Sequence, residues 1–241
     1  MIRLGNFFFH YRNGLFPLAY LLLFWKSPPL LKNHLVAAGI GLIIALTGQL
    51  LRAVTIGLAY IRRGGKKRQV YADTLVTEGI FGHCRNPLYL GNFIIVLGLG
   101  CAANSLLFML AGVPFFALAY WAIIAAEENY LRQKFGRQFD DYCARVSRLL
   151  PNFAGLGRTW RSTQFNWQRL VVKEYGSAYV WMSGIIVLVM KNSWLRHGYA
   201  ASRAEEWLLS GLLALITLAY GFARLLKKTR LLHAEQNRPA A

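Results

Sequence analysis

Two groups of polar residues flank a long apolar stretch, and their side chains could together bind a charged ligand. The first is the segment Arg85 to Gly91, which includes Tyr89, and the second is the acidic pair Glu127-Glu128. The mostly apolar residues between them suffice for about two membrane crossings at roughly 20 residues each. Because two crossings return the chain to the side that it left, we expect Tyr89 and Glu127 at one membrane face, as a candidate reaction site.

Arg85 and the helix start that follows it form a candidate anion site. Pro87 disfavours helix at Asn86 and permits it afterwards, so a helix should begin near Pro87. The first N–H groups of a helix lack partners and its dipole is positive there, which suits a carboxylate or a phosphate. Tyr89 can stack and donate a hydrogen bond, and Gly91 leaves space for a close neighbour. The simpler alternative is an ordinary juxtamembrane arginine beside an interfacial tyrosine.

The acidic pair lies where the fourth apolar segment ends. Successive side chains on a helix point about 100° apart, so Glu127 and Glu128 cannot face one ligand equally. We expect one of them to face the Arg85 site, where it could bind a hydroxyl pair or a cation, and the other to point outward or support the first. The alternative is a solvated helix face on which Glu128 pairs with Arg132.

Arg52 is an ionisable residue inside the second apolar segment, where charge is costly and needs a reason. Gln49 lies three residues earlier and therefore on the same helical face. Two interpretations stay open. The Arg52 side chain either extends to the membrane interface or lines a site that holds a ligand anion.

The composition predicts the elements that must position these residues. The 241 residues are 56% hydrophobic and 16% charged, with a mean hydropathy of +0.34, which is typical of a polytopic membrane protein. The net charge of +18 does not indicate a nucleic-acid partner, because the basic residues lie in short runs between apolar segments. We expect an all-α helical bundle with about six transmembrane helices and a cytoplasmic cofactor site. The expected crossings are residues 14–31, 34–60, 87–103, 105–126, 175–190 and 206–223.

The distribution of Lys and Arg predicts the orientation. With these six crossings, one side receives 22 of the basic residues and the other receives five, which places both termini and the candidate site in the cytoplasm. The general style of the sequence suggests a bacterial source, so we expect the bacterial inner membrane. The first crossing is interrupted by Lys26 and by Pro28-Pro29. Residues 7–9, three phenylalanines, could either form an interfacial helix or simply begin that crossing.

The remaining chain gives an approximate organisation and no metal site. We expect N-terminal transmembrane helices over 1–60, a core with the polar motifs over 61–151, and an amphipathic connector with two further crossings over 152–241. The three cysteines form no spaced pair, and the five histidines are scattered, so no metal is expected. The sequence leaves the oligomeric state open.

The motifs resemble a known family. The run Leu75-Val76-Thr77-x-Gly79 with Arg85-Asn86-Pro87-x-Tyr89-x-Gly91 is similar to the signature of the isoprenylcysteine carboxyl methyltransferase and phospholipid methyltransferase superfamily. The second half of that signature is matched by Glu127-Glu128-x-x-Leu131, Phe135-Gly136 and Val146-x-Arg148-x-x-Pro151, and an upstream element by Gly48-x-x-Leu51-Arg52. The resemblance covers about residues 40–151.

The resemblance implies an integral membrane enzyme that uses S-adenosylmethionine. In that superfamily the cofactor lies at the cytoplasmic end, beneath a cap that follows the acidic pair, and an amphipathic or lipid-like acceptor enters from the bilayer. Carried over to this chain, the cofactor-binding residues are Val76, Gly79, His83, Asn86, Pro87, Tyr89, Leu90, Glu127 and Glu128. The residues expected to act on the acceptor are Arg85, Glu128 and Arg52.

Departures from the signature leave the acceptor open. Phe81 stands where Tyr is common, and Ser147 replaces a common Pro. A carboxylate acceptor needs no base, and Arg52 or Arg85 could orient it. An amine must lose a proton, for which Glu128 or His83 is the candidate base.

Three other classes compete with a methyltransferase. A steroid-reductase-like membrane enzyme would bind NADPH at a similar hairpin. A non-catalytic membrane partner would keep the fold without the activity. A transporter is compatible with six crossings and an intramembrane arginine, but the sequence has neither a repeat nor a pair of broken helices.

Overall fold

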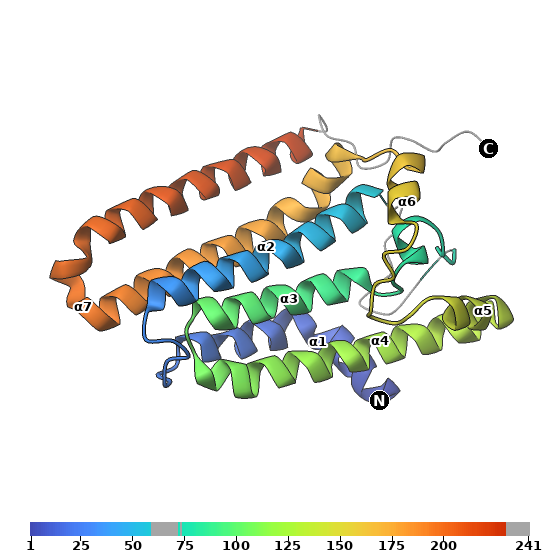
Figure 1. Ribbon diagram of the computed structural model, residues 1–241, viewed down its shortest axis with the longest axis horizontal. Helices are drawn as coiled ribbons and strands as arrows, with labels where there is room; N and C mark the ends of the chain where they lie inside the picture. Colours follow the sequence, from blue (N-terminus) through green and yellow to red (C-terminus); the bar gives the residue numbers. More distant parts are fainter. Residues whose placement is uncertain (59–71, 73, 230–241) are drawn as a thin grey trace.

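The computed structural model describes residues 1–58, 72 and 74–229, and within these the side chains of 199–202 are excluded. The described residues form helices and no strands, which confirms the all-α prediction (Figure 1). The elements are listed here in chain order: α1 (Ile2–Tyr20), the 3₁₀ helix η1 (Leu21–Phe24), α2 (His34–Leu58), η2 (Gly79–Gly82), α3 (Pro87–Ala102), the π-helical turn η3 (Phe108–Gly112), α4 (Val113–Phe135), α5 (Arg137–Arg145), α6 (Leu156–Ser162) and α7 (Trp167–Lys228).

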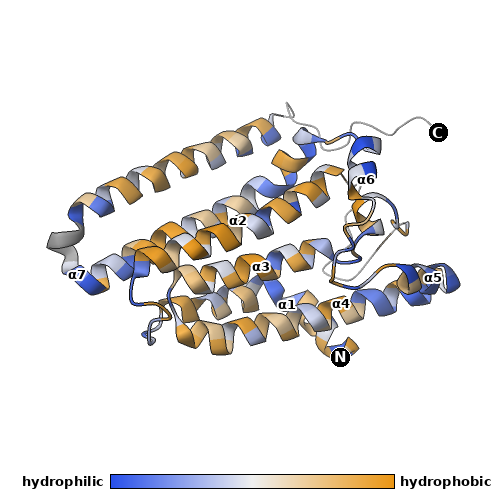
Figure 2. Ribbon diagram, viewed as in Figure 1, coloured by the Kyte–Doolittle hydropathy of each residue, from blue (hydrophilic) through white to orange (hydrophobic). Residues whose placement is uncertain are grey.

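Within the described ranges, four helical segments are long and apolar enough to cross a membrane. They are His34–Leu58, Phe108–Phe135, Trp167–Gly198 and Arg203–Lys228, and their apolar residues dominate the ribbons in Figure 2. The last two are parts of α7, which has non-helical backbone at Gly198. Helix α3 is apolar but shorter, so its crossing and that of α1 stay predictions.

The predicted first crossing, residues 14–31, was placed wrongly. Helix α1 already begins at Ile2, and the segment containing Lys26 and Pro28-Pro29 is not helical. Phe8 and Phe9 are buried against α4, so residues 7–9 belong to this packed helix rather than to a separate interfacial one. The hydropathy pattern misplaced the helix because Arg3 and Arg12 lower the mean hydropathy of its first half, although one face of that half packs inside the protein.

Helices α2 and α3 pack at unusually short range through glycines. A Cβ at Gly48 would lie 2.6 Å from the carbonyl oxygen of Gly91, and a Cβ at Gly98 would lie 2.6 Å from that of Gly41. These two antiparallel pairs, each seven residues apart on its helix, let the backbones touch, as small residues do in membrane bundles. The predicted close neighbour of Gly91 is therefore α2, including the stem of Arg52.

A tight turn joins α3 to η3 and α4. Asn104 adopts a left-handed conformation with φ 52°, which Asn tolerates better than most residues. Its side chain exchanges hydrogen bonds with the Leu31 backbone, from Leu31 N (2.8 Å) and to Leu31 O (2.9 Å). The turn brings the start of α3 and the end of α4 to the same end of the molecule, near α5 and α6 (Figure 1).

Candidate functional site

A cavity of about 1200 Å³ opens among α1, α2, α3, α4, α5 and the first part of α7. Its polar end is lined by residues of the sequence motifs, among them Arg85, Asn86, Tyr89, Glu127 and Glu128. Its other end is an apolar arm whose lining includes Leu23, Leu99, Trp181, Gly184 and Leu188. The cavity thus has one polar and one apolar end, which matches the polar head and apolar chain of an amphiphile.

The hairpin places Tyr89 and Glu127 together, as predicted. The Tyr89 hydroxyl donates a 2.8 Å hydrogen bond to Glu127 Oε1, and both residues line the cavity. Arg12 of α1 lines the same region with its guanidinium 4.2 Å from the centroid of the Phe9 ring. Sequence reasoning missed Arg12, although an arginine within an apolar helix was the available signal.

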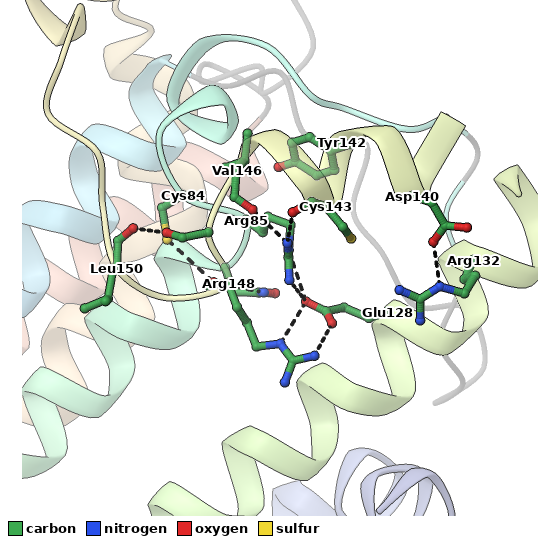
Figure 3. A network of polar contacts seen from close by, with 12 residues as sticks. Cys84, Arg85, Glu128, Arg132, Asp140, Tyr142, Cys143, Val146, Arg148 and Leu150 are labelled. Carbon is green, nitrogen blue, oxygen red and sulfur yellow. Dashed lines mark hydrogen bonds and ion pairs between the residues drawn. The ribbon is translucent and has the colours of Figure 1, made fainter. Parts of the chain in front are cut away.

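Glu128 is held by two arginines (Figure 3). Its Oε1 accepts from Arg85 Nη2 at 3.0 Å, and its Oε2 accepts from Arg148 Nη2 at 2.6 Å. The alternative of a solvated face with a Glu128–Arg132 pair is therefore wrong, since Arg132 instead donates to Asp140 at 2.7 Å on the surface. Because both Glu128 oxygens already accept hydrogen bonds, this carboxylate is poorly placed to take a proton from an acceptor.

Arg85 binds the segment that follows α4, here called the cap (residues 137–151), to the end of the hairpin. Besides Glu128, its guanidinium donates to the carbonyl oxygens of Cys143 (3.0 Å), in the last turn of α5, and of Val146 (2.7 Å), directly after α5. Helix α3 begins at Pro87 as predicted, and Asn86 before it donates to the Arg148 carbonyl at 3.2 Å. Arg85 lines the cavity, but most of its N–H groups bind the protein rather than face an anion.

His83 has a different place from the one predicted. Its Nδ1 lies 2.7 Å from the carbonyl oxygen of Asn152, and its Nε2 lies 2.8 Å from Thr159 Oγ1. Since a carbonyl can only accept, Nδ1 is the donor of the first of these hydrogen bonds. His83 thereby anchors α6, and it is not among the residues lining the cavity, so the structure does not place it as a base for an acceptor.

Buried groups in the same cap favour their neutral forms. Burial raises the pKa of the Cys84 thiol, which points at the carbonyl oxygens of Arg148 (3.7 Å) and Leu149 (3.5 Å). Burial likewise raises the pKa values of Cys143 and of Tyr142, whose hydroxyl donates to the Phe81 carbonyl at 2.8 Å. These groups hold the cap together and carry no charge near neutral pH.

Arg52 forms an ion pair inside the protein. Its Nε and Nη2 donate to the two carboxylate oxygens of Glu174 on α7, at 2.9 and 2.5 Å, and its Nη1 contacts Asn92. Gln49 shares the face of Arg52 as predicted, donating to Glu174 at 2.9 Å. Sequence reasoning missed Glu174 and Asn92, although an acidic residue at the edge of an apolar segment calls for a partner of opposite charge.

The cavity contains most, but not all, of the predicted site residues. The residues that line it are Arg52, Val76, Arg85, Asn86, Pro87, Tyr89, Glu127 and Glu128. Gly79, His83 and Leu90 lie outside its lining. Across the part of the chain that the structure describes, no group of three or more His, Cys, Asp or Glu side chains could hold a metal ion.

Fold and site together define a polytopic helical membrane protein with an interior amphipathic cavity. The profile of the family called Phospholipid methyltransferase matches residues 34–138. The cobalt-zinc-cadmium resistance protein CzcN of Cupriavidus metallidurans is 32% identical over 168 residues, which cover 68% of this chain and 68% of that protein. The nickel-cobalt-cadmium resistance protein NccN of Alcaligenes xylosoxydans xylosoxydans is 31% identical over 54% of this chain and 55% of its own length.

A plant enzyme gives a further match. Protein-S-isoprenylcysteine O-methyltransferase B of Arabidopsis thaliana is 32% identical over 51% of this chain and 64% of that enzyme. No solved structure matches. The chain therefore belongs to the family of membrane proteins that comprises phospholipid and isoprenylcysteine carboxyl methyltransferases, which includes enzymes dependent on S-adenosylmethionine. The names of the two bacterial relatives state metal resistance and no reaction.

Proposed function

We propose that this protein is an S-adenosylmethionine-dependent methyltransferase that acts on an amphipathic acceptor reached from the bilayer. The observation that carries the proposal is the single cavity whose polar end joins Tyr89 to Glu127 and whose apolar arm runs between helices. Its volume of about 1200 Å³ exceeds the roughly 300–1,000 Å³ of ordinary small-molecule sites, as expected for a cofactor together with a lipid-like acceptor.

The residues present fit S-adenosylmethionine. Glu127 offers a carboxylate, fixed by Tyr89, to ribose hydroxyls or to an ammonium group. The start of α3 at Pro87 offers the N–H groups of a first helical turn to a carboxylate. Val76 and Leu131 add apolar surface to the same lining for a purine ring.

When bound, the cofactor would supply a methyl group on a sulfonium, so that an acceptor lone pair gains the carbon while the C–S electron pair returns to sulfur. Such a displacement depends mainly on alignment. The protein contributes by enclosing the reactants beneath the cap that Arg85 and Arg148 fasten to Glu128. If the acceptor is an amine, Glu127 is the carboxylate of the cavity lining best placed to take its proton, because Glu128 is bound to arginines.

The orientation is part of the proposal. Helices α5 and α6 and the start of α3 lie at one end of the bundle (Figure 1). The polar cavity residues at the start of α3 belong to this end, which carries the basic residues that favour the cytoplasm. Single cysteines placed at exposed Arg137 and at exposed Lys32 should differ in labelling by a membrane-impermeant maleimide in intact cells. Labelling at position 32 alone supports a cytoplasmic site, whereas labelling at position 137 alone contradicts it.

The first test is calorimetric binding of S-adenosylmethionine to detergent-purified protein, with NADPH as the comparator. Glu127→Gln and Tyr89→Phe should weaken binding at least tenfold, and Asp140→Asn, at an exposed pair away from the cavity, should not. Absence of S-adenosylmethionine binding by folded wild type would overturn the proposal. Binding of NADPH instead would favour a reductase, and binding of neither would favour a non-catalytic partner.

A further inference from the structure

Arg52 occupies the junction between the two ends of the cavity. On α3, the lining residues run from Tyr89 at the polar end through Asn92 to Ile95 and Leu99 in the apolar arm. Arg52 contacts Asn92, in the middle of this series. An amphiphile whose chain fills the apolar arm therefore brings its head group past Arg52 before it reaches Tyr89.

The charge of Arg52 is already neutralised from the side away from the cavity. Glu174 binds the Nε and Nη2 edge of the guanidinium with both carboxylate oxygens, and such a bidentate pair is stronger than a single charge-assisted hydrogen bond. The side chain of Glu174 is 5% exposed, and this residue does not itself line the cavity. Glu174 thus takes the place that an acceptor anion would otherwise occupy on Arg52.

Further contacts fix the pair in this arrangement. Gln49 donates to Glu174 Oε2 at 2.9 Å and accepts from the Trp181 indole at 2.8 Å. Arg52 and Gln49 thus join α2 to two positions on α7, Glu174 and Trp181, that lie about two turns apart. Glu174 lies beyond residues 34–138, the part that the family profile matches, so this neutralisation comes from the C-terminal part of the chain.

Glu127, the other carboxylate near the head group, has no bound counter-ion in the described part of the chain, although Arg12 lines the same region and acts on it electrostatically. Among the described residues, Glu127 forms no ion pair within 4.0 Å and accepts the Tyr89 hydroxyl instead. A head group that passes the neutral Arg52–Glu174 pair therefore meets a carboxylate, which attracts an ammonium group and repels an anion.

We infer that Glu174 is a specificity-determining residue, which neutralises Arg52 so that the cavity takes amphiphiles with an amine head group in preference to carboxylates. Glu174 acts through Arg52 and touches neither reactant. The inference rests on the proposed function in one respect: if the protein is a methyltransferase, the acceptor of the methyl group is an amine. As a statement about head-group selection, it can be measured without any cofactor.

The test is competitive binding of dodecylamine and dodecanoate at equal concentrations, read by native mass spectrometry of the detergent-solubilised protein, with dodecanol as an uncharged reference. Wild type should bind the amine at least tenfold better than the carboxylate. Glu174→Gln, which leaves Arg52 charged and without its counter-ion, should move this ratio at least tenfold toward the carboxylate. Arg52→Gln should move it in the opposite direction, because Glu174 then adds an unneutralised negative charge.

Two further variants separate selectivity from damage to the fold. The double variant Arg52→Gln/Glu174→Gln removes both charges and should keep the wild-type preference, since removing a buried pair together is tolerated far better than removing one partner. Asp140→Asn should change nothing. If Glu174→Gln does not fold, the inference is still tested by the amine-to-carboxylate binding ratio of the wild type and by the change of that ratio in Arg52→Gln.

Equal or better binding of the carboxylate to wild type would overturn the inference, as would an unchanged ratio in folded Glu174→Gln. Failure of the proposed function would appear separately, as absence of S-adenosylmethionine binding. The predicted amine preference would then describe a binding site without methyl transfer.

Discussion

Gly48 on α2 and Gly91 on α3 face each other so closely that a Cβ on Gly48 would lie 2.6 Å from the Gly91 carbonyl oxygen. This contact sets the distance between the helix that carries Arg52 and the helix that carries Tyr89. The packing of two glycines thus controls the width of the cavity where a head group would pass.

Gly48→Ala should therefore lower stability and disturb the site. The added methyl meets backbone and the Ile95 side chain (2.9 Å), and such overpacking costs about 1–3 kcal/mol. We expect a lower apparent melting temperature in detergent and weaker binding of S-adenosylmethionine. Gly39→Ala, on the same helix with nothing within 4 Å of the new methyl, is the matched control and should be neutral or slightly stabilising.

Tyr89→Phe tests the bond that closes the hairpin. Loss of the hydroxyl leaves Glu127 without its 2.8 Å donor. Because Glu127 is only half-buried, the cost should lie near the lower end of the roughly 1–3 kcal/mol of an unsatisfied buried acceptor. The melting temperature and the affinity for S-adenosylmethionine should both fall. Tyr130→Phe provides a comparison from the same chain, since Tyr130 is outside the cavity lining; an equal loss of affinity there would contradict the assigned role.

Glu128→Gln should be far more harmful than Asp140→Asn. Glu128 compensates two guanidinium groups at a buried position, and removing one partner of a buried pair costs about 3–5 kcal/mol. The Arg132–Asp140 pair is about half exposed on both sides, where ion pairs contribute about 0–1 kcal/mol. Limited proteolysis should show the cap released in the first variant alone. Similar cleavage of both would mean that the cap does not depend on Glu128.

The raised pKa of Cys84 predicts a pH dependence of stability. Burial keeps this thiol protonated in the folded state above its ordinary value of 9.0, so the unfolded chain loses the proton first as pH rises. The contribution is complete below that ordinary value and is lost as pH rises from it toward the folded pKa. Cys84→Ala should flatten the fall in melting temperature between pH 8 and pH 10, roughly one unit either side of the ordinary thiol pKa.

A second measurement on the same residue is independent of melting. Maleimide reacts with thiolates, so buried Cys84 should be modified much more slowly at pH 8 in the folded protein than in denaturant. Rapid labelling of Cys84 in the folded protein would contradict its burial.

The sequence predicts the hairpin well because simple lengths determine it. The apolar run between the motifs fits two crossings, and Tyr89 therefore meets Glu127, 38 positions later. The start of α3 at Pro87 follows equally from the chemistry of proline.

Side-chain partners depend on the packing of whole helices and were harder to predict. Helix geometry separates Glu127 from Glu128 by an angle but does not say which of them meets Arg85. The position of Glu174 indicates that it needs a partner, but its pairing with Arg52 requires α7 to return against α2, and no local pattern encodes that arrangement. The misplaced first helix has a similar cause: Gly5 packs directly on the Ala122 backbone, and hydropathy carries no signal for such a contact.

The last part of α7, Arg203–Lys228, buries none of its most apolar window inside the protein. Its described contacts with the rest of the chain include stacking of Tyr220 on Tyr175 and Tyr179 and a 3.3 Å hydrogen bond between Thr217 and Tyr179. A scan of all substitutions should therefore find two kinds of position. Tyr220 and Thr217 should accept few replacements. Exposed positions such as Leu208, Leu215 and Leu218 should accept almost any apolar residue. Related chains can therefore differ freely at these exposed positions while their cavities stay alike.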